Sequence, residues 1–407
     1  MIEVRHIDAD TFMPWTRQLV TTFGDDAEDQ DFLLGVRSSI DLERSWGAFD
    51  GALAVGTASS TRAQVTLPWT SSAPFAAVSA VTVKATHRRR GILTQMMRRQ
   101  LTEFHEREEP IAGLWASEAA IYPRFGYGLG TYAASLRVRR EASAFRHVKR
   151  VEQVVEIDRA VARQMLPGIQ ARAAGGHPGF VVRSEEQWND AFFDPPAFRH
   201  GASPQRFVVH QDAGGPDGYV RYRTRHQWGA DGERGSTLEV LELQALTAEA
   251  YATLWRYCLD VDLMVQVEAR HRSVDEPLRH LLVDARALQV RASDGLWLRL
   301  VDVAPALALR RYANEGELVL EVADDFCPWN AGRVLLATGD GAARATPTGR
   351  EPDLVVDART LAGLYLGANR AVTLRRAGAI EERTPGAAEC ADRLFAADAT
   401  PWCPTGF

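Results

Sequence analysis

The stretch VTVKATHRRRGILTQMM, residues 81–97, joins a β-branched run to an apolar helical pattern through a basic turn. The run AAVSAVTV (76–83) predicts a β-strand, and GILTQMMRRQLTEFHERE (91–108) predicts a helix. A second strand is predicted in PIAGLWAS (110–117). Strand, helix and strand in this order indicate a β-α-β unit, and so an α/β fold.

The basic turn in the middle of this unit suits an anionic ligand. The first amide N–H groups of a helix have no partner within it and carry the positive end of its dipole. Gly91 would let a ligand approach the backbone, and Arg88, Arg89 and Arg90 would add charge-assisted hydrogen bonds. We therefore expect a phosphate or pyrophosphate here. The alternative is a solvated surface turn, although arginines at a helix start oppose its dipole.

The turn does not match the two common nucleotide-binding patterns. It is neither G-x-x-x-x-G-K-[ST] nor G-x-G-x-x-G, so a nucleoside triphosphate or NAD is disfavoured. The net charge of −6 also argues against a nucleic-acid partner.

Length and composition bound the class of protein. A chain of 407 residues exceeds what one hydrophobic core usually serves, so two or three domains are expected. The four cysteines are scattered without metal-ligand spacing, which predicts neither a metal site nor a disulfide framework and favours a cytoplasmic location. No apolar run is long enough to predict a signal peptide or a membrane span.

Three sections follow one another along the chain. Residues 1–140 contain the β-α-β unit and a predicted hairpin around Asp50 and Gly51. Residues 141–295 repeat the plan faintly in GSTLEVLELQALTAEAYATLWRYCLDVDLMVQVEA (235–269), where ALTAEA replaces the basic glycine turn. This section is interpreted as a duplicated module that has lost its ligand. Residues 296–407 mix strands and helices and end without a charged tail.

The basic turn resembles the acetyl-coenzyme A turn of GNAT-type N-acetyltransferases, here with Leu93 in place of the usual small last residue. More narrowly, the whole chain resembles the enhanced intracellular survival (Eis) family of actinobacterial acetyltransferases. The stretches that carry this resemblance occur in all three sections: VTVKATHRRRGILTQMM (81–97), LWASEAAIYPRFGYGLGT (114–131), LELQALTAEAYATLWRYCLD (241–260), DGLWLRLVDVAPALALRRYA (294–313), LYLGA (364–368) and a terminal phenylalanine.

The resemblance implies a catalytic GNAT domain over residues 1–140, a degenerate GNAT domain over 141–295 and a domain similar to sterol carrier protein 2 over 296–407. It implies acetyl-CoA as co-substrate, a homohexamer, and acetylation of primary amines of small polyamines such as aminoglycosides. The residues expected to hold the coenzyme are Val81, Thr82 and Val83 on an exposed strand edge, Arg88, Arg89, Arg90, Gly91, Ile92, Leu93 and Thr94 in the turn, and Ser117 and Glu118 on the following strand.

Two catalytic residues follow from the same resemblance. Tyr122 matches the general acid of the family, and the carboxylate of Phe407 matches its general base. The last residues are apolar, including Trp402 and Phe407, which suggests a docked tail whose burial would raise the pKa of the terminal carboxylate. The alternatives are that Tyr122 is a core aromatic residue and that Phe407 is a frayed end. Tyr127 is the competing tyrosine and is expected to pack.

The amine side of the site is less well determined by sequence. Asp25 and Asp26 begin a run of five carboxylates in FGDDAEDQDF (23–32), which would attract cationic amines or form a solvated loop. Phe32 and Trp46 are candidate apolar walls or core residues. Relatives can carry an acidic residue before the terminal phenylalanine, where this chain has Gly406.

Two rival functions remain open at this point. One is a lysine acetyltransferase that acts on proteins or peptides. The other is a lipid-binding scaffold with a vestigial acetyltransferase, which would require LYLGA and LVLEV (318–322) to line an open apolar tunnel.

Overall fold

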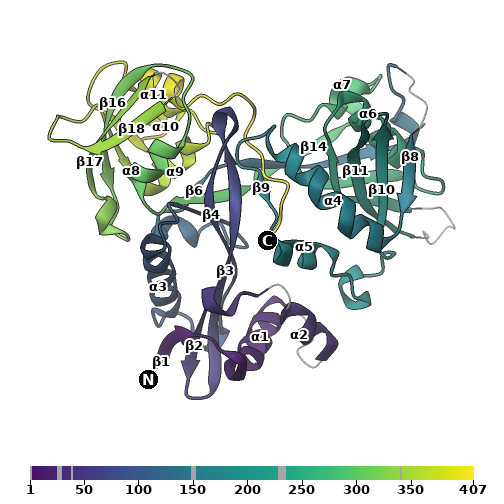
Figure 1. Ribbon diagram of the computed structural model, residues 1–407, viewed down its shortest axis with the longest axis horizontal. Coiled ribbons are helices and arrows are strands. Elements are labelled where there is room, and N and C mark those ends of the chain that lie inside the picture. Colours follow the sequence, from purple (N-terminus) through teal and green to yellow (C-terminus); the bar gives the residue numbers. More distant parts are fainter. Residues whose placement is uncertain (1, 25–29, 38–39, 148–152, 228–234, 340–341) are drawn as a thin grey trace.

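The computed structural model describes residues 2–24, 30–37, 40–147, 153–227, 235–339 and 342–407. Their strands form three sheets with helices packed against them (Figure 1). This confirms the mixed α/β class expected from the sequence. A long hairpin of the first sheet rises between the two other sheets, and the end of the chain returns to this central region (Figure 1).

The first sheet is built around the predicted β-α-β unit. Its strand order is β1-β2-β3-β4-β5-β15-β6, with β9 paired to β3. The neighbouring strands are antiparallel except β4 and β5, which are parallel and connected by helix α3. The strands are β1 (Ile2–His6), β2 (Ser45–Asp50), β3 (Leu53–Leu67), β4 (Ser71–Val83), β5 (Ile111–Trp115), β6 (Gly128–Leu129), β9 (Val181–Val182) and β15 (Leu296–Leu300).

Helices cover both faces of this sheet. Side chains alternate along a strand, so the neighbours Ala48 and Phe49 on β2 face opposite sides. Ala48 belongs to the apolar cluster of α3 (Ile92–Glu106), and Phe49 to that of α1 (Ala9–Phe23). A capping box between Asp8 and Thr11 begins α1, which is followed in the chain by α2 (Gln30–Arg37).

The second sheet repeats the plan of the first, as the sequence indicated. Its strand order is β14-β7-β13-β12-β11-β10-β8, and β12 and β13 are the parallel pair, connected by α6. The elements are β7 (Tyr132–Arg139), β8 (Val154–Ile157), β10 (Arg206–Asp212), β11 (Gly215–Arg225), β12 (Thr237–Ala245), β13 (Gln266–Arg272), β14 (Gln289–Asp294), α4 (Arg159–Ala174), α5 (Glu185–Phe192), α6 (Ala248–Asp260) and α7 (Leu278–Leu281).

The third sheet has the order β18-β17-β16-β19-β20. Residues of both LVLEV and LYLGA are buried in its apolar core, among them Leu318, Leu320, Leu364 and Tyr365. The elements are β16 (Gly316–Ala323), β17 (Gly332–Gly339), β18 (Ala342–Pro347), β19 (Leu354–Asp357), β20 (Ile380–Glu382), α8 (Val303–Leu309), α9 (Ala358–Tyr365), α10 (Ala371–Arg376) and α11 (Ala387–Leu394).

Two strands cross the segment boundaries expected from the sequence. Strand β7 precedes residue 140 but pairs with β13 and β14 in the second sheet. Strand β15 follows residue 295 but pairs with β5 in the first sheet. The sheets are therefore not divided at residues 140 and 295, because strand pairing is decided by neighbours in space.

The last residues are docked, as their composition indicated. The backbone N–H of Trp402 donates to the carbonyl of Pro178 at 2.8 Å, and its indole N–H donates to the carbonyl of His271 at 2.7 Å. The indole N–H of Trp115 on β5 donates to the carbonyl of Thr405 at 2.8 Å. The tail therefore contacts the first and the second sheet near their shared border.

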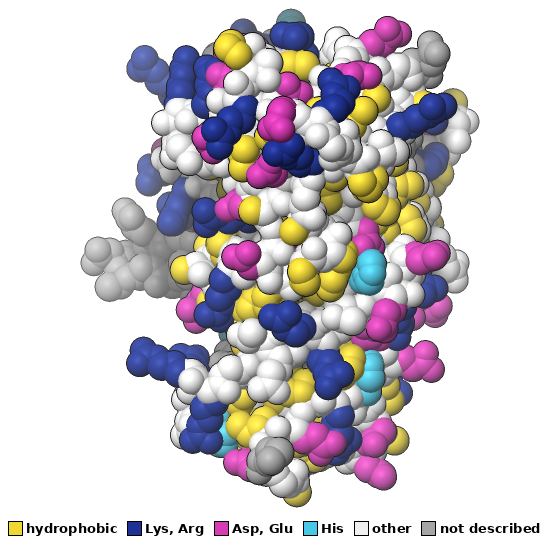
Figure 2. Space-filling model, turned by 90° about the vertical axis from the view of Figure 1, so that its left-hand side faces the viewer, with side chains coloured by type: hydrophobic (Ala, Val, Ile, Leu, Met, Phe, Trp, Pro, Cys, Tyr) yellow, Lys and Arg dark blue, Asp and Glu magenta, His cyan; other side chains and the backbone are white. Residues whose placement is uncertain are grey.

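The surface beside the third sheet carries mixed charge. Figure 2 shows basic and acidic side chains interspersed on the face that it displays. The third sheet supplies exposed ion pairs, such as Arg350 with Glu317 at 2.7 Å. Among the described residues, no helix is both long and apolar enough to cross a membrane.

Candidate functional site

A bulge in β4 opens the first sheet next to the predicted turn. The parallel pairing of β4 with β5 ends at Val78 and Leu114. Just beyond it, Ala80 has a φ of 54°, and the pairing register with β3 shifts. The Thr57 hydroxyl donates to the Ala80 carbonyl at 2.6 Å and supports this conformation. No described strand lies beside the β5-facing edge of β4 after Val78, so backbone groups there are available to a ligand.

A groove of about 520 Å³, here called the turn groove, runs along this free edge to the start of α3. Almost all the residues predicted to hold the coenzyme line it. They are Val81, Thr82, Val83, Arg88, Arg89, Gly91, Ile92, Leu93, Thr94, Ser117 and Glu118.

The backbone of the basic turn is suited to an anion. Arg89 and Gly91 both adopt left-handed conformations, with φ of 62° and 76°. Gly91 is the N-cap of α3, and no side chain caps the helix there. A Cβ atom at Gly91 would meet open space, so the groove is open above the glycine. The first N–H groups of the 15-residue helix α3 therefore have no capping side chain in the described structure.

A central cavity of about 430 Å³ adjoins the turn groove between the ends of β4 and β5. Tyr122 and Phe407, the two predicted catalytic residues, both line it. The central cavity shares Val81, Ser117 and Tyr122 with the turn groove. Two residues 285 positions apart in the sequence are thus brought to one cavity, by the turn after β5 and by the docked tail.

The Tyr122 hydroxyl is held in its neutral form. Tyr122 begins a short 3-10 helix, Tyr122–Phe125, and is buried with a relative exposure of 5%. Burial raises the pKa of Tyr122, and the nearby Glu118 raises it further, while a hydrogen bond with Ser117 acts against both. Burial penalises the phenolate, so Tyr122 carries its proton across the neutral range.

The turn that carries Tyr122 is supported from below by a buried ion pair. Gly126 ends the 3-10 helix with a φ of 82°, and a Cβ atom there would collide with the Arg299 guanidinium. Arg299 donates to Asp324 at 2.5 Å, and both side chains are almost fully buried. Tyr127 is fully buried against this group and its ring is 5.9 Å from that of Tyr122. Tyr127 is therefore a core residue, as expected.

The end of the chain presents its carboxylate without a salt bridge to any described residue. The Phe407 side chain is half-buried, and its ring lies edge-on to Phe75 with a centroid distance of 6.0 Å. The Thr405 hydroxyl donates to the Val181 carbonyl at 2.6 Å and positions the last two residues. These contacts hold the terminal residue at the central cavity.

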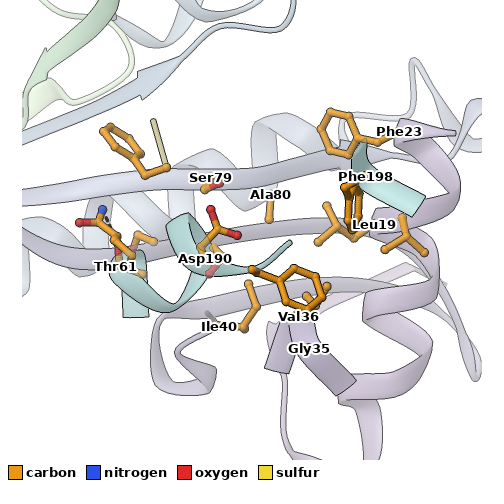
Figure 3. A pocket seen from close by; sticks show the side chains of 16 residues that line it. Leu19, Phe23, Gly35, Val36, Ile40, Thr61, Ser79, Ala80, Asp190 and Phe198 are labelled. Carbon is orange, nitrogen blue, oxygen red and sulfur yellow. Dashed lines mark hydrogen bonds between the residues drawn. The ribbon is translucent and has the colours of Figure 1, made fainter. Parts of the chain in front are cut away.

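A third space of about 420 Å³, here called the apolar cavity, adjoins the central cavity. Figure 3 shows the side chains that line it. The two cavities share Phe23, Ser79, Ala80 and Phe407. Most of the other wall is hydrophobic, with side chains from α1 and from the chain around α2 and α5. These are Leu19, Val20, Val36, Ile40, Phe193 and Phe198.

Not all predicted site residues lie in these three spaces. Trp46 does not lie at the amine site, contrary to expectation. Its indole N–H donates to Glu103 of α3 at 2.7 Å, its ring is tilted against that of His6 with a centroid distance of 3.8 Å, and it lines a separate surface groove. Arg90 is exposed and is absent from the described lining of the turn groove. Asp25 and Asp26 lie outside the described residues. Phe32 belongs to α2, but its side chain also lies outside the described part.

Sequence reasoning missed the contribution of the second sheet. Gln187 and Asp190 of α5 line the apolar cavity, and Arg270 and His271 of β13 line the central cavity. Burial lowers the pKa of His271, with a further contribution from Arg270. No local motif marks these positions, because they become neighbours of the first sheet only through the packing of the two GNAT-like units.

Family comparisons agree with this architecture. Residues 3–130 and residues 179–300 each match an acetyltransferase (GNAT) domain family, and residues 303–404 match a sterol carrier protein domain family. Over its whole length the chain is 39% identical to an uncharacterized N-acetyltransferase of Streptomyces avermitilis, of which it covers 99%.

The chain is also similar in sequence and structure to N-acetyltransferases of the Eis type. The chain is 34% identical to the N-acetyltransferase Eis of Mycobacterium tuberculosis, over 86% of this chain and 85% of the relative. The crystal structure of Eis1 from Mycobacterium abscessus superposes over the full length of both chains, with a TM-score of 0.85 and 35% identity. A GCN5-related N-acetyltransferase from Anabaena variabilis shares the fold, with a TM-score of 0.87 and 21% identity over both full chains.

Fold, domain matches and relatives together define an N-acetyltransferase of the GNAT class, whose co-substrate is acetyl-CoA. Within that class, the chain belongs to the Eis family. The predicted order of two GNAT domains followed by a domain similar to sterol carrier protein 2 is confirmed.

Proposed function

We propose that the protein transfers the acetyl group of acetyl-CoA directly to a primary amine of a small polyamine, aminoglycosides included. The observation that carries this proposal is the central cavity, which Tyr122 and Phe407 both line and which connects the turn groove to the apolar cavity. One side then receives the coenzyme and the other the amine.

The turn groove has the chemistry that the coenzyme requires. The free N–H groups at the start of α3 would bind its diphosphate, with Arg88 and Arg89 adding positive charge. The free edge of β4 from Val81 to Val83 would pair with the amide groups of the pantetheine arm, as an added strand does. These contacts would direct the thioester toward Tyr122.

The terminal carboxylate would act on the amine. An alkyl ammonium has a pKa of roughly 10.4, so its deprotonation at pH 7 costs about 4.6 kcal/mol. Phe407 lines the border between the central and apolar cavities, so its carboxylate would hold the ammonium and accept its proton. The amine nitrogen then bonds to the acetyl carbon as the carbon–sulfur bond breaks.

Tyr122 would complete the reaction. Its raised pKa keeps the hydroxyl protonated, so it would donate a proton to the departing thiolate of CoA. The acetyl group passes straight to the amine, so no nucleophilic serine or cysteine is required.

The two rivals differ in what they would require of the structure. A lysine side chain presents the same reacting group, so peptide acetylation uses the same catalytic residues and differs only in the occupant of the apolar cavity. Lipid carriage would require an open tunnel in the third domain. Leu318, Leu320, Leu364 and Tyr365 instead pack in its core, which favours the enzyme.

The test is an acceptor panel with the purified chain ending at its native Phe407. Thiol release from acetyl-CoA and product mass would be measured with kanamycin, simple alkyl amines and a lysine peptide. The proposal expects acetylated small amines with a higher kcat/KM than the peptide. Acetylation of the peptide alone would instead support the protein acetyltransferase. Sedimentation of the same sample would test the hexamer. Detection of the protein in the cytoplasmic fraction of its native host would test the location. Both are proposed from the family alone.

A further inference from the structure

Asp190 brings a single charged side chain to the wall of the apolar cavity. It lies in the last turn of α5, and its carboxylate points into the space between Ala80 and Ile40 (Figure 3). Apart from the terminal carboxylate of Phe407, the described lining is otherwise hydrophobic or uncharged. Asp190 is exposed, so a cationic group that enters the cavity can reach its carboxylate.

The Asp190 carboxylate has no hydrogen-bond or ion-pair partner within the described part of the chain. The nearest cations that act on it are Arg183 and Arg221. Both are already bound to Glu242, Arg183 at 2.7 Å and Arg221 at 3.2 Å. The protein atoms packed around Asp190 raise its pKa in spite of both arginines, while its side chain remains exposed to a ligand.

The position of Asp190 is fixed by contacts on several sides of α5. Ser184 and Gln187 form a capping box at its start, and the Gln187 side chain also donates to Thr61 on β3 at 3.2 Å. At its end, Arg221 donates to the Ala191 carbonyl at 2.5 Å. The helix is thus held to both sheets, so the carboxylate is presented in a preorganised place.

The cavity around Asp190 leads to the place where the amine would react. Ser79, Ala80 and Phe407 border both cavities, so a ligand whose reacting nitrogen is at Phe407 extends toward Asp190. Apolar side chains, including Phe23, Leu19 and Phe198, form one part of the cavity wall, on the side of Ala80 away from Ser79 (Figure 3). Such a wall suits a chain of methylene groups.

We propose that Asp190 is a specificity-determining residue that binds a second ammonium group of the acceptor, and that preferred acceptors carry two amines separated by an aliphatic segment. This inference rests on the proposed amine acetylation and adds the substrate class. The second GNAT unit then contributes the recognition of the acceptor, while the first supplies the chemistry.

The experiment compares 1,6-diaminohexane with n-hexylamine, which has the same length and one ammonium group fewer. For the unchanged enzyme, kcat/KM for the diamine, corrected for its two equivalent amines, should exceed that for the monoamine by about tenfold or more, as expected for a charge-assisted contact. Asp190→Asn should remove most of this preference by raising KM for the diamine. The monoamine rate should stay the same, and Asp190→Glu should retain part of the preference.

Glu186→Gln is the matched control, because it removes the same charge from a position of the same helix that is outside the described lining of the apolar cavity. It should leave the preference intact. Equal loss toward diamine and monoamine in Asp190→Asn, or no diamine preference in the unchanged enzyme, would overturn the proposal. Calorimetry with 1,6-diaminohexane in the presence of CoA tests the role of Asp190 in binding separately from the proposed acetyl transfer. Binding that depends on Asp190 without acetyl transfer would support Asp190 and reject the proposed function.

Discussion

The Thr405 hydroxyl donates a 2.6 Å hydrogen bond to the Val181 carbonyl, and this contact ties the end of the chain to strand β9 of the first sheet. Gln170 of α4 donates to the same hydroxyl at 3.2 Å. Thr405 is completely buried, so both contacts are shielded from water. One side chain thereby joins the tail, the first sheet and the second GNAT unit two residues before the terminal carboxylate.

Thr405→Val should loosen this anchor while preserving its shape. The valine cannot bond to the Val181 carbonyl or the Gln170 amide, and each hydrogen bond lost contributes about 0.5–1.5 kcal/mol. Gln170 still donates to the Val181 carbonyl at 3.1 Å, so neither group is left unpaired. We expect a lower melting temperature and a reduced kcat, with unchanged affinity for CoA in calorimetry. Thr405→Ser, which retains the hydroxyl, should recover most of the activity. Full kcat in the valine variant would show that the anchor does not position the carboxylate.

An extension beyond Phe407 should abolish most of the turnover. Adding two glycines converts the carboxylate of Phe407 to an amide and moves the new terminus away from the cavity. The measured quantity is the initial rate of thiol release under saturating acetyl-CoA. The same two glycines placed at the amino terminus serve as the control, and an extended enzyme that is as active as this control would refute a terminal base.

Tyr122→Phe should lower kcat by roughly 10²–10⁴ without weakening CoA binding. In the unchanged enzyme the rate should rise with pH as the amine loses its proton. The raised pKa of Tyr122 means that the acid form is lost only above its usual value of about 10, so no decline is expected before that point. An alkaline decline well below pH 10 that vanishes in the variant would contradict the raised pKa.

Tyr127→Phe is the matched control for that variant. The Tyr127 hydroxyl is buried without a hydrogen-bond partner among the described residues, so its removal should leave activity intact and not lower the melting temperature.

Replacing Arg88 and Arg89 together by glutamine should weaken the binding of the coenzyme and leave kcat nearly unchanged. Both side chains line the turn groove, where they would bind phosphate oxygens. We expect KM for acetyl-CoA to rise about tenfold or more, with a smaller salt dependence than in the unchanged enzyme. Arg90→Gln, next in sequence but outside the described groove lining, should have little effect. Equal losses at all three positions would indicate a diffuse electrostatic effect.

Local patterns in the sequence were sufficient for the β-α-β unit of the first sheet. The β-branched run before Lys84 and the apolar periodicity after Gly91 predict β4 and α3, because strands and helices bury side chains at different periods. The basic glycine turn likewise indicates an anion at the helix start. The family resemblance predicted that Tyr122 and Phe407 belong to one active site. Their spacing in the sequence alone leaves this open.

Other features depended on contacts between distant segments. Trp46 was expected beside the amine, but the alternation of side chains on β2 turns it toward Glu103 on α3. The exchange of β7 and β15 between sheets is decided by which strand edges meet.

The sequence by itself determined the α/β class, the basic helix start and the apolar character of the tail, since each depends on residues close together in the chain. The tertiary structure alone decided that Asp190 and His271 of the second unit face cavities of the first. The physical reason is that a cavity is bounded by surfaces packed together in space, and the burial and charge at its wall depend on all of them.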